Sequence, residues 1–233
     1  MTATATKRAL HPDDPRTRWP IFSFGDAAKF LGGSERTLRD WAHPRGDREP
    51  VITSFETRGR QPVLPFIGFA EAYVLLSLRK VGLPLQRIRP AVRELKSTIG
   101  LDHALASRNL YTDGAEVLYH YADDENDLTV VRSGQRLFRQ MIESYLKRIH
   151  YGADGWADRL ELPDYGHATV IVDPRMAFGR PLVQSGGARV QDIVDRFNAG
   201  ESIDSLAEDF RVPAEDIEDV LRVETRSAGR TAA

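Results

Sequence analysis

The chain has 233 residues, of which 41% are hydrophobic and 28% charged, so it has room for one large soluble domain or two to three small ones. It contains no cysteine, which excludes disulfides and thiolate metal sites and agrees with a cytoplasmic location. No run approaches the roughly 20 apolar residues that a membrane span needs, and residues 1–8 lack the apolar stretch of a signal peptide.

The net charge of −2 is unevenly distributed. Residues 1–100 carry 17 Lys and Arg against 10 Asp and Glu, whereas residues 101–165 and 166–233 have net charges of −5 and −4. A basic N-terminal part is where a polyanion such as nucleic acid would bind. Chance clustering of charges on solvated faces is the alternative.

Residues 1–17 are rich in Thr, Ala, Pro and charge without an apolar period, so we expect a flexible arm. Lys7, Arg8, Arg16 and Arg18 could reach phosphates from this arm, although an unstructured tail explains them equally simply.

A helix-turn-helix is predicted after the arm. The first helix covers about residues 25–31, and Gly32-Gly33 offers the positive φ angles that a sharp turn between helices needs. Ser34 is placed to cap the second helix, and Pro44 ends it. Leu38 and Trp41 fall three residues apart, so we expect both to face the core.

Two short apolar runs follow, Val51-Ile52 and Val63-Leu64, and they flank the basic turn Arg58-Gly59-Arg60. This pattern predicts a β-hairpin, which after a helix-turn-helix is typical of a DNA-binding wing. A solvated turn is the alternative. The residues predicted to contact DNA, in the major groove or on the backbone, are Arg36, Thr37, Arg39, Arg45, Arg48, Arg58 and Arg60.

The stretch from Phe22 to Trp41, with Asp26-Ala27-Ala28 and Arg36-Thr37-Leu38-Arg39, resembles the winged helix-turn-helix of MerR-type regulators. The resemblance covers roughly residues 20–100. Trp41-Ala42 stands where that family has an aromatic-acidic pair, and the wing also departs from the family pattern. No cysteine exists for metal sensing of the family's usual sort.

Two helices are predicted next, over about residues 68–81 and 85–97, and the first is apolar on more than one side. Residues 101–165 read as a small α+β unit, with short strands near 111, 117–119, 128–131 and 159–162 and a helix over 135–147. We expect this unit to link the domains or to dimerise. The acidic turn over 123–127 admits a metal-nuclease interpretation, but a solvated turn explains it, because no acidic partner occurs at helical spacing.

Residues 166–223 predict an extended entry followed by three helices, over about 190–198, 202–210 and 213–223. Ser202 caps the second helix, and Pro213 begins the third. The apolar residues predicted to form its core are Ile193, Val194, Phe197, Ile203, Leu206, Ala207, Phe210, Val212, Ile217, Val220 and Leu221. Because its last two helices are acidic, we favour a protein-contact or dimer role over DNA binding for this block.

This block is similar to a family of small helix-turn-helix domains found in bacterial antitoxins and long described as of unknown function. The similarity is carried by Asp173-Pro174-Arg175, Phe178-Gly179-Arg180-Pro181, Gly187-Ala188-Arg189-Val190, Ala199-Gly200-Glu201-Ser202 and Leu206-Ala207-Glu208-Asp209-Phe210. Ala188 stands where that family commonly has threonine. With the winged domain, the chain resembles a VapB-type antitoxin, and the resemblance implies a PIN-like ribonuclease toxin as partner.

Residues 224–233 are predicted to form a flexible tail. A PIN-type nuclease has an acidic, metal-binding active site, so Arg226 or Arg230 could occupy that site when the toxin is bound. An unimportant tail is the alternative.

The sequence therefore predicts a mainly α protein with small β elements. Its parts are an arm (1–17), a winged helix-turn-helix (18–100), an α+β linker (101–165), a C-terminal helix-turn-helix (166–223) and a tail (224–233). The predicted function is that of a homodimeric, cytoplasmic antitoxin, without a cofactor or metal and not an enzyme, that neutralises its toxin and binds operator DNA to repress its own operon. A MerR-like regulator without a toxin partner is the alternative.

Overall fold

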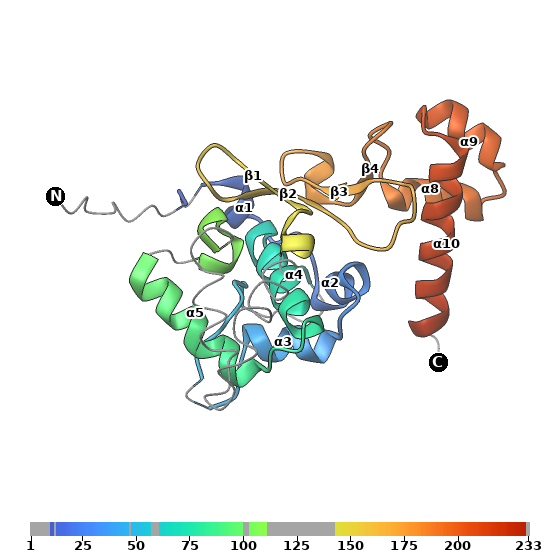
Figure 1. Cartoon of the computed structure of the whole chain (residues 1–233). Helices are drawn as coiled ribbons and strands as arrows, with labels where there is room; N and C mark the ends of the chain where they lie inside the picture. Colours follow the sequence, from blue (N-terminus) through green and yellow to red (C-terminus); the bar gives the residue numbers. More distant parts are fainter. Residues whose placement is uncertain are drawn as a thin grey trace, which may run out of the picture. The chain divides into compact units, whose positions relative to one another are not determined.

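The computed structural model describes residues 10–11, 13–46, 48–56, 61–99, 103–110 and 143–231. The chain divides into two compact units, Met1–Asp158 and Arg159–Ala233. The boundary falls inside a strand, whereas the sequence predicted boundaries after residues 100 and 165. The expected fold class is confirmed, because helices dominate both units and the strands are few and short (Figure 1).

The first unit is built around one buried helix. Its helices are α1 (Pro15–Arg18), α2 (Phe24–Leu31), α3 (Glu35–Ala42), α4 (Phe66–Lys80) and α5 (Leu85–Ile99), followed by the 3-10 turn η1 (Ala104–Ala106). Helix α4 lies between α5 and the α2–α3 pair (Figure 1). Phe66, Ile67, Phe69 and Leu75 of α4 are fully buried, as the apolar sequence of this helix predicted. Packing on several sides explains why its apolar residues form no single stripe.

The segment before α2 is tied down from residue 13 onward, so the predicted flexible arm is wrong for that part. Arg16 is buried and pairs with both Asp14 and Asp154. Its guanidinium lowers the pKa of both carboxyl groups below the ordinary value. A buried arginine must be paired. One of its partners, Asp14, precedes helices α2–α5 in the sequence, and the other, Asp154, follows them. Arg16 is therefore a structural residue and is not available to phosphates, and Lys7 and Arg8 lie outside the described residues.

The strands form a small antiparallel sheet in the order β1-β2-β3-β4. They are β1 (Ile149–Tyr151), β2 (Ala157–Glu161), β3 (Val170–Val172) and β4 (Leu182–Val183). Leu160 pairs with Val172, and Val170 pairs with Val183. All three residues of β3 are buried, as expected for a β-branched central strand.

The second unit packs three helices, α8 (Val190–Asn198), α9 (Ile203–Phe210) and α10 (Ala214–Thr231), beyond the 3-10 turn η3 (Ala177–Gly179). The predicted bounds of α8 are confirmed, and the Ser202 side chain caps α9 by accepting from the Ser205 N–H at 3.2 Å. Ile193, Leu206, Ile217 and Val220 are fully buried at the centre of the unit. Phe197 is 40% exposed, so its assignment to the core is wrong.

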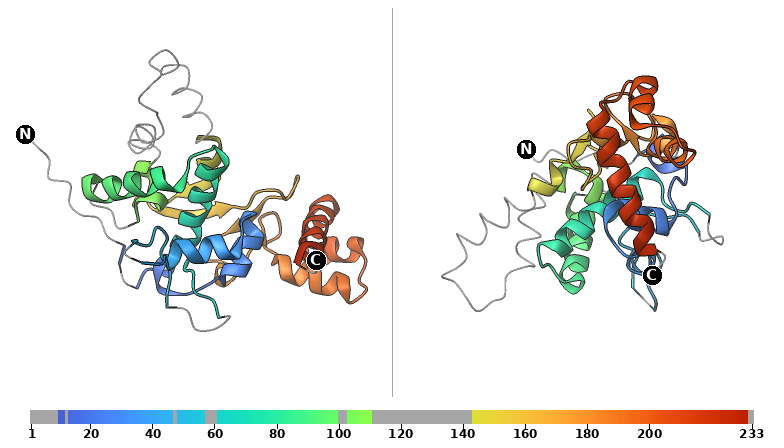
Figure 2. Two further views of the ribbon diagram at one scale, coloured as in Figure 1. Left: turned by 90° about the horizontal axis from the view of Figure 1, so that it is seen from below. Right: turned by 90° about the vertical axis from the view of Figure 1, so that its right-hand side faces the viewer.

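Helix α10 does not end at Val223 but continues to Thr231, so residues 224–231 are helical and the predicted unstructured tail is wrong there. Figure 2 shows α10 extending well past the other two helices of its unit. The reason lies far away in sequence: the buried Tyr165 hydroxyl donates to the buried Glu224 carboxylate at 2.8 Å. Burial and this carboxylate together raise the pKa of Tyr165. Glu224, the first residue beyond the predicted end, therefore anchors the part of the helix that continues to Thr231.

Residues 111–142 lie outside the described residues. The strands predicted near 111, 117–119 and 128–131, most of the helix predicted over 135–147 and the acidic turn over 123–127 fall in that range and stay predictions. Residues 143–146 are helical, and the strand predicted over 159–162 is confirmed as part of β2.

Candidate nucleic-acid interface

The two helices α2 and α3 are joined by the tight, capped turn that the sequence predicted. Ser23 and Asp26 form a capping box at the start of α2, with Ser23 Oγ accepting from the Asp26 N–H at 3.0 Å. Gly32 ends α2 in the left-handed conformation, with φ of 66°. Ser34 Oγ then accepts from the Thr37 N–H at 3.1 Å and begins α3. The orphan N–H and C=O groups at this corner are thus satisfied locally.

Gly33 has a different role from the one predicted, because only Gly32 of the pair has a positive φ. A Cβ atom on residue 33 would lie 3.0 Å from Leu76 Cδ1 of α4, which is tighter than most side-chain contacts. Gly33 therefore lets the turn approach α4 closely, and this contact fixes how α3 is presented.

Helix α3 has a buried face and an exposed face, on which Arg36 and Arg39 lie among the acidic Glu35 and Asp40. Leu38 and Trp41 are buried, as predicted, whereas Arg36 and Arg39 are exposed. Arg39 pairs with Glu35 one turn earlier, and its guanidinium lies 5.7 Å from the centroid of the Phe24 ring. Arg36 has no hydrogen-bond or ion-pair partner among the described residues. Of the cations on α3, Arg36 can therefore bind an anion with the least loss of existing contacts.

Thr37 is half-buried, and its hydroxyl lies 3.0 Å from Ser34 Oγ. The predicted contact residue thus also belongs to the cap of α3. On binding DNA, the Thr37 side chain would either keep this hydrogen bond or exchange it for one to the DNA.

The predicted β-hairpin is only partly formed in the described residues. Val51 and Ile52 form no strand; both are buried, and the Val51 N–H donates to the Trp41 carbonyl at the end of α3. Leu64 pairs instead with Phe22 in an antiparallel bridge, and the Phe55 N–H donates to the Val63 carbonyl at 2.8 Å. The first arm was mispredicted because a short β-branched pair buries as readily against a helix as in a ladder. Arg58 and Arg60 lie outside the described residues.

Arg45 and Arg48 are exposed in the loop that follows α3. Three further cations of α5 lie beside Arg48, and no role was predicted for them. They are Arg89, Arg93 and Lys96. Burial and the charge of Arg48 lower the pKa of Arg89. The signal was present in the sequence, because positions 89, 93 and 96 recur at intervals of four and three and so share one helix face.

The described residues hold no group of three His, Asp or Glu side chains that could bind a metal ion. In the same part of the chain, no helix is both long and apolar enough to cross a membrane. What the first unit presents is a capped second helix with Arg36 and Arg39 exposed, followed by a loop in which Arg45 and Arg48 are exposed as well. This arrangement defines a helix-turn-helix protein of the DNA-binding class.

Comparisons with known proteins agree with this class. A family model described as "Putative DNA-binding HTH domain" matches residues 20–92, and one described as "Protein of unknown function (DUF433)" matches residues 170–222. The chain is 36% identical over 222 residues to "Putative antitoxin VapB45" of Mycobacterium tuberculosis, covering 87% of this chain and 92% of that protein. The crystal structure of Rv2018 from Mycobacterium tuberculosis is similar with a TM-score of 0.75 and 34% identity, covering 88% of this chain and 99% of that one. The chain belongs to the VapB-type antitoxin family.

Proposed function

We propose that the chain is the antitoxin of a type II toxin–antitoxin pair. It binds and neutralises a PIN-like ribonuclease toxin, and it binds operator DNA as a cytoplasmic homodimer to repress its own operon. The proposal rests above all on the 36% identity to an antitoxin over most of both chains. Arg36 supports the DNA-binding half of it, because this residue is exposed on a capped second helix and has no ion-pair partner in the part of the chain that the structure describes.

In this proposal helix α3 lies in the major groove with the MerR-like geometry that the sequence resembles. Arg36 and Arg39 contact base edges or phosphates, Thr37 lies beside them, and Arg45 and Arg48 contact the backbone. Arg58 and Arg60, which the sequence places at the tip of the predicted wing, contribute further contacts. A homodimer would place two copies of α3 about one helical turn of DNA apart, or a multiple of that distance.

Arg226 and Arg230 are the proposed toxin contacts. Arg226 is exposed, and positions 226 and 230 lie one turn apart in α10. Truncation after Val223 is unsuitable as a test, because it also removes Glu224 and leaves the Tyr165 hydroxyl without its partner. The double variant Arg226→Ala, Arg230→Ala keeps that anchor. If these two arginines contact the toxin, the double variant should bind the toxin more weakly than the wild type and bind DNA equally well. Toxin binding equal to that of the wild type would exclude both arginines as toxin contacts.

Affinity capture of the full chain with the protein encoded beside it tests the function as a whole. A stable complex that abolishes the toxicity of that protein is the expected result. DNA binding without any such complex would instead favour the MerR-like regulator without a toxin partner.

A further inference from the structure

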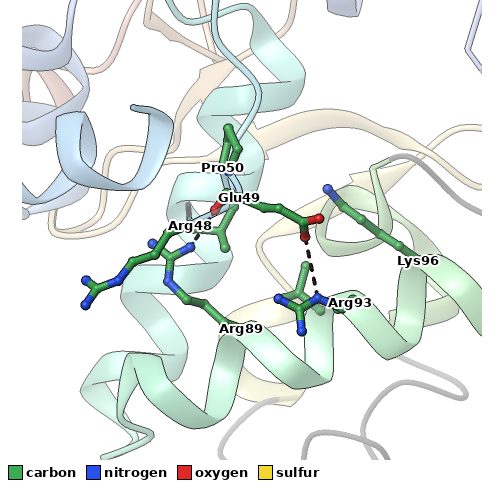
Figure 3. A pocket seen from close by; sticks show the side chains of 8 residues that line it. Arg48, Glu49, Pro50, Arg89, Arg93 and Lys96 are labelled. Atoms are coloured by element: carbon green, nitrogen blue, oxygen red, sulfur yellow. Dashed lines mark hydrogen bonds and ion pairs between the residues drawn. The ribbon is translucent and has the colours of Figure 1, made fainter. Parts of the chain in front are cut away.

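A basic recess lies between the loop that follows α3 and one face of α5. We call it the basic pocket and define its cations as Arg48, Arg89, Arg93 and Lys96. Figure 3 shows the three α5 side chains projecting toward the loop that carries Arg48. The recess has a volume of about 130 Å³. Two buried valines, Val51 and Val92, also line it, so its apolar wall is rigid while its cations reach solvent.

The charges of the basic pocket are poorly compensated. Glu49 is the one carboxylate that lines it, and its Oε2 lies 3.5 Å from Arg93 Nε. Arg89 donates to the Glu49 backbone carbonyl, which holds the loop but neutralises no charge. Within the described residues, Arg48 and Lys96 have no ion-pair or hydrogen-bond partner. Four cations thus line the pocket with one carboxylate, and a bound anion would offset the excess positive charge.

The donor types favour a phosphate group over a carboxylate. Three guanidinium groups and one ammonium offer many N–H donors, and guanidinium forks match phosphate oxygens in geometry. The loop begins only a few residues after Ala42, the last residue of α3, so the pocket and the proposed recognition helix belong to one rigid domain.

We propose that the basic pocket binds a backbone phosphate of the DNA that α3 contacts. This inference rests on the proposed DNA-binding function and deepens it, because it adds Arg93 and Lys96 of α5 to the interface. A backbone contact positions the protein on the duplex and carries no sequence information. Removing one such cation should therefore weaken binding to any duplex by the same factor.

The test uses the full chain, with fluorescence anisotropy on two duplexes: the region upstream of its own gene and a scrambled duplex of equal length. Arg93→Gln and Lys96→Gln should each weaken binding to both duplexes by on the order of 5-fold. Each should also lower the slope of log affinity against log salt by about 1. Glu49→Gln should strengthen binding, because it removes the carboxylate that competes with phosphate for Arg93. Lys147→Gln removes one charge from an exposed lysine outside the pocket and should match the wild type.

The outcomes separate the inference from the function on which it rests. If the wild type binds neither duplex, the proposed function fails. If the wild type binds but Arg93→Gln, Lys96→Gln and Glu49→Gln all match Lys147→Gln, the basic pocket is not part of the interface. A thermal-shift titration with inorganic phosphate completes the test. Saturable stabilisation by phosphate that Arg93→Gln abolishes, with unchanged DNA affinity, would assign the pocket to a free phosphate ligand and overturn the inference.

Discussion

The substitution Gly68→Ala should strongly destabilise the first unit, although it adds a single methyl group inside a helix. Gly68 is buried in α4, where the segment through Thr53 crosses it. A Cβ atom on residue 68 would lie 1.9 Å from the Thr53 carbonyl oxygen, a separation that real Cβ atoms do not show. Relief requires the Thr53 backbone to move by about 1 Å, since contacts shorter than 3.0 Å are essentially absent.

The Thr53 backbone cannot move freely, because a buried polar cluster holds it. Its N–H donates to Glu71 Oε2 at 2.6 Å, and its hydroxyl lies 3.0 Å from His103 Nδ1. Glu71 Oε1 lies 3.2 Å from the same imidazole nitrogen, and Glu71 is 3% exposed. Overpacking costs about 1–3 kcal/mol. Loss of the hydrogen bond to the Glu71 carboxylate adds about 1.5–3 kcal/mol. The sum of about 2.5–6 kcal/mol is a large part of a typical domain's stability of about 5–15 kcal/mol.

Urea unfolding of the full chain, followed by circular dichroism, measures the effect. Gly25→Ala in α2 is the matched control, because its Cβ would meet its nearest neighbour, Glu35 Oε2, at an ordinary 3.5 Å. Alanine at a helical glycine should stabilise the chain by about 0.5–1 kcal/mol. A Gly68→Ala protein whose free energy of unfolding lies within about 0.5 kcal/mol of the wild-type value would refute the reasoning, because ordinary surface substitutions change that free energy by as much.

Three further results are expected. Arg36→Ala should weaken binding to the upstream duplex by about 10-fold or more and reduce discrimination against a scrambled duplex, as measured by anisotropy, and equal losses on both would make Arg36 a backbone contact. Tyr165→Phe should lower the free energy of unfolding by about 1–2 kcal/mol, since it removes the hydrogen bond that the Tyr165 hydroxyl donates to the buried Glu224 carboxylate; an unchanged urea midpoint would contradict this. The folded-state pKa values of Asp14 and Asp154 are lowered by Arg16, so their contribution to stability is present above the ordinary value of 3.8 and lost as the pH falls below it. Arg16→Met should reduce the loss of stability that the wild type shows as the pH falls. An unchanged loss would show that the pairing with Arg16 does not cause it.

Local signals were sufficient for the helices that are capped within their own sequence. The caps Ser34 and Ser202 and the left-handed Gly32 all lie beside the helix ends that they define, so α2, α3 and α9 could be predicted from neighbouring residues. These signals also identified the helix pair that presents Arg36.

Long-range contacts account for what could not be predicted. Helix α10 continues because Tyr165, 59 residues earlier, buries Glu224. Arg16 is fixed by Asp154, 138 residues later, so a segment without apolar period is ordered after all. Val51 attaches to the end of α3 rather than to a partner strand. For the site, the three α5 cations could have been placed on one helix face, but their approach to Arg48 depends on how the loop packs against that helix.

RNA cleavage by the proposed ribonuclease toxin, followed as purified chain is added, is the measurement that tests the antitoxin proposal most directly. The account predicts that cleavage falls steadily and stops near an equimolar ratio, because neutralisation is by direct binding. Full cleavage in the presence of a large molar excess of folded, DNA-binding chain would contradict it.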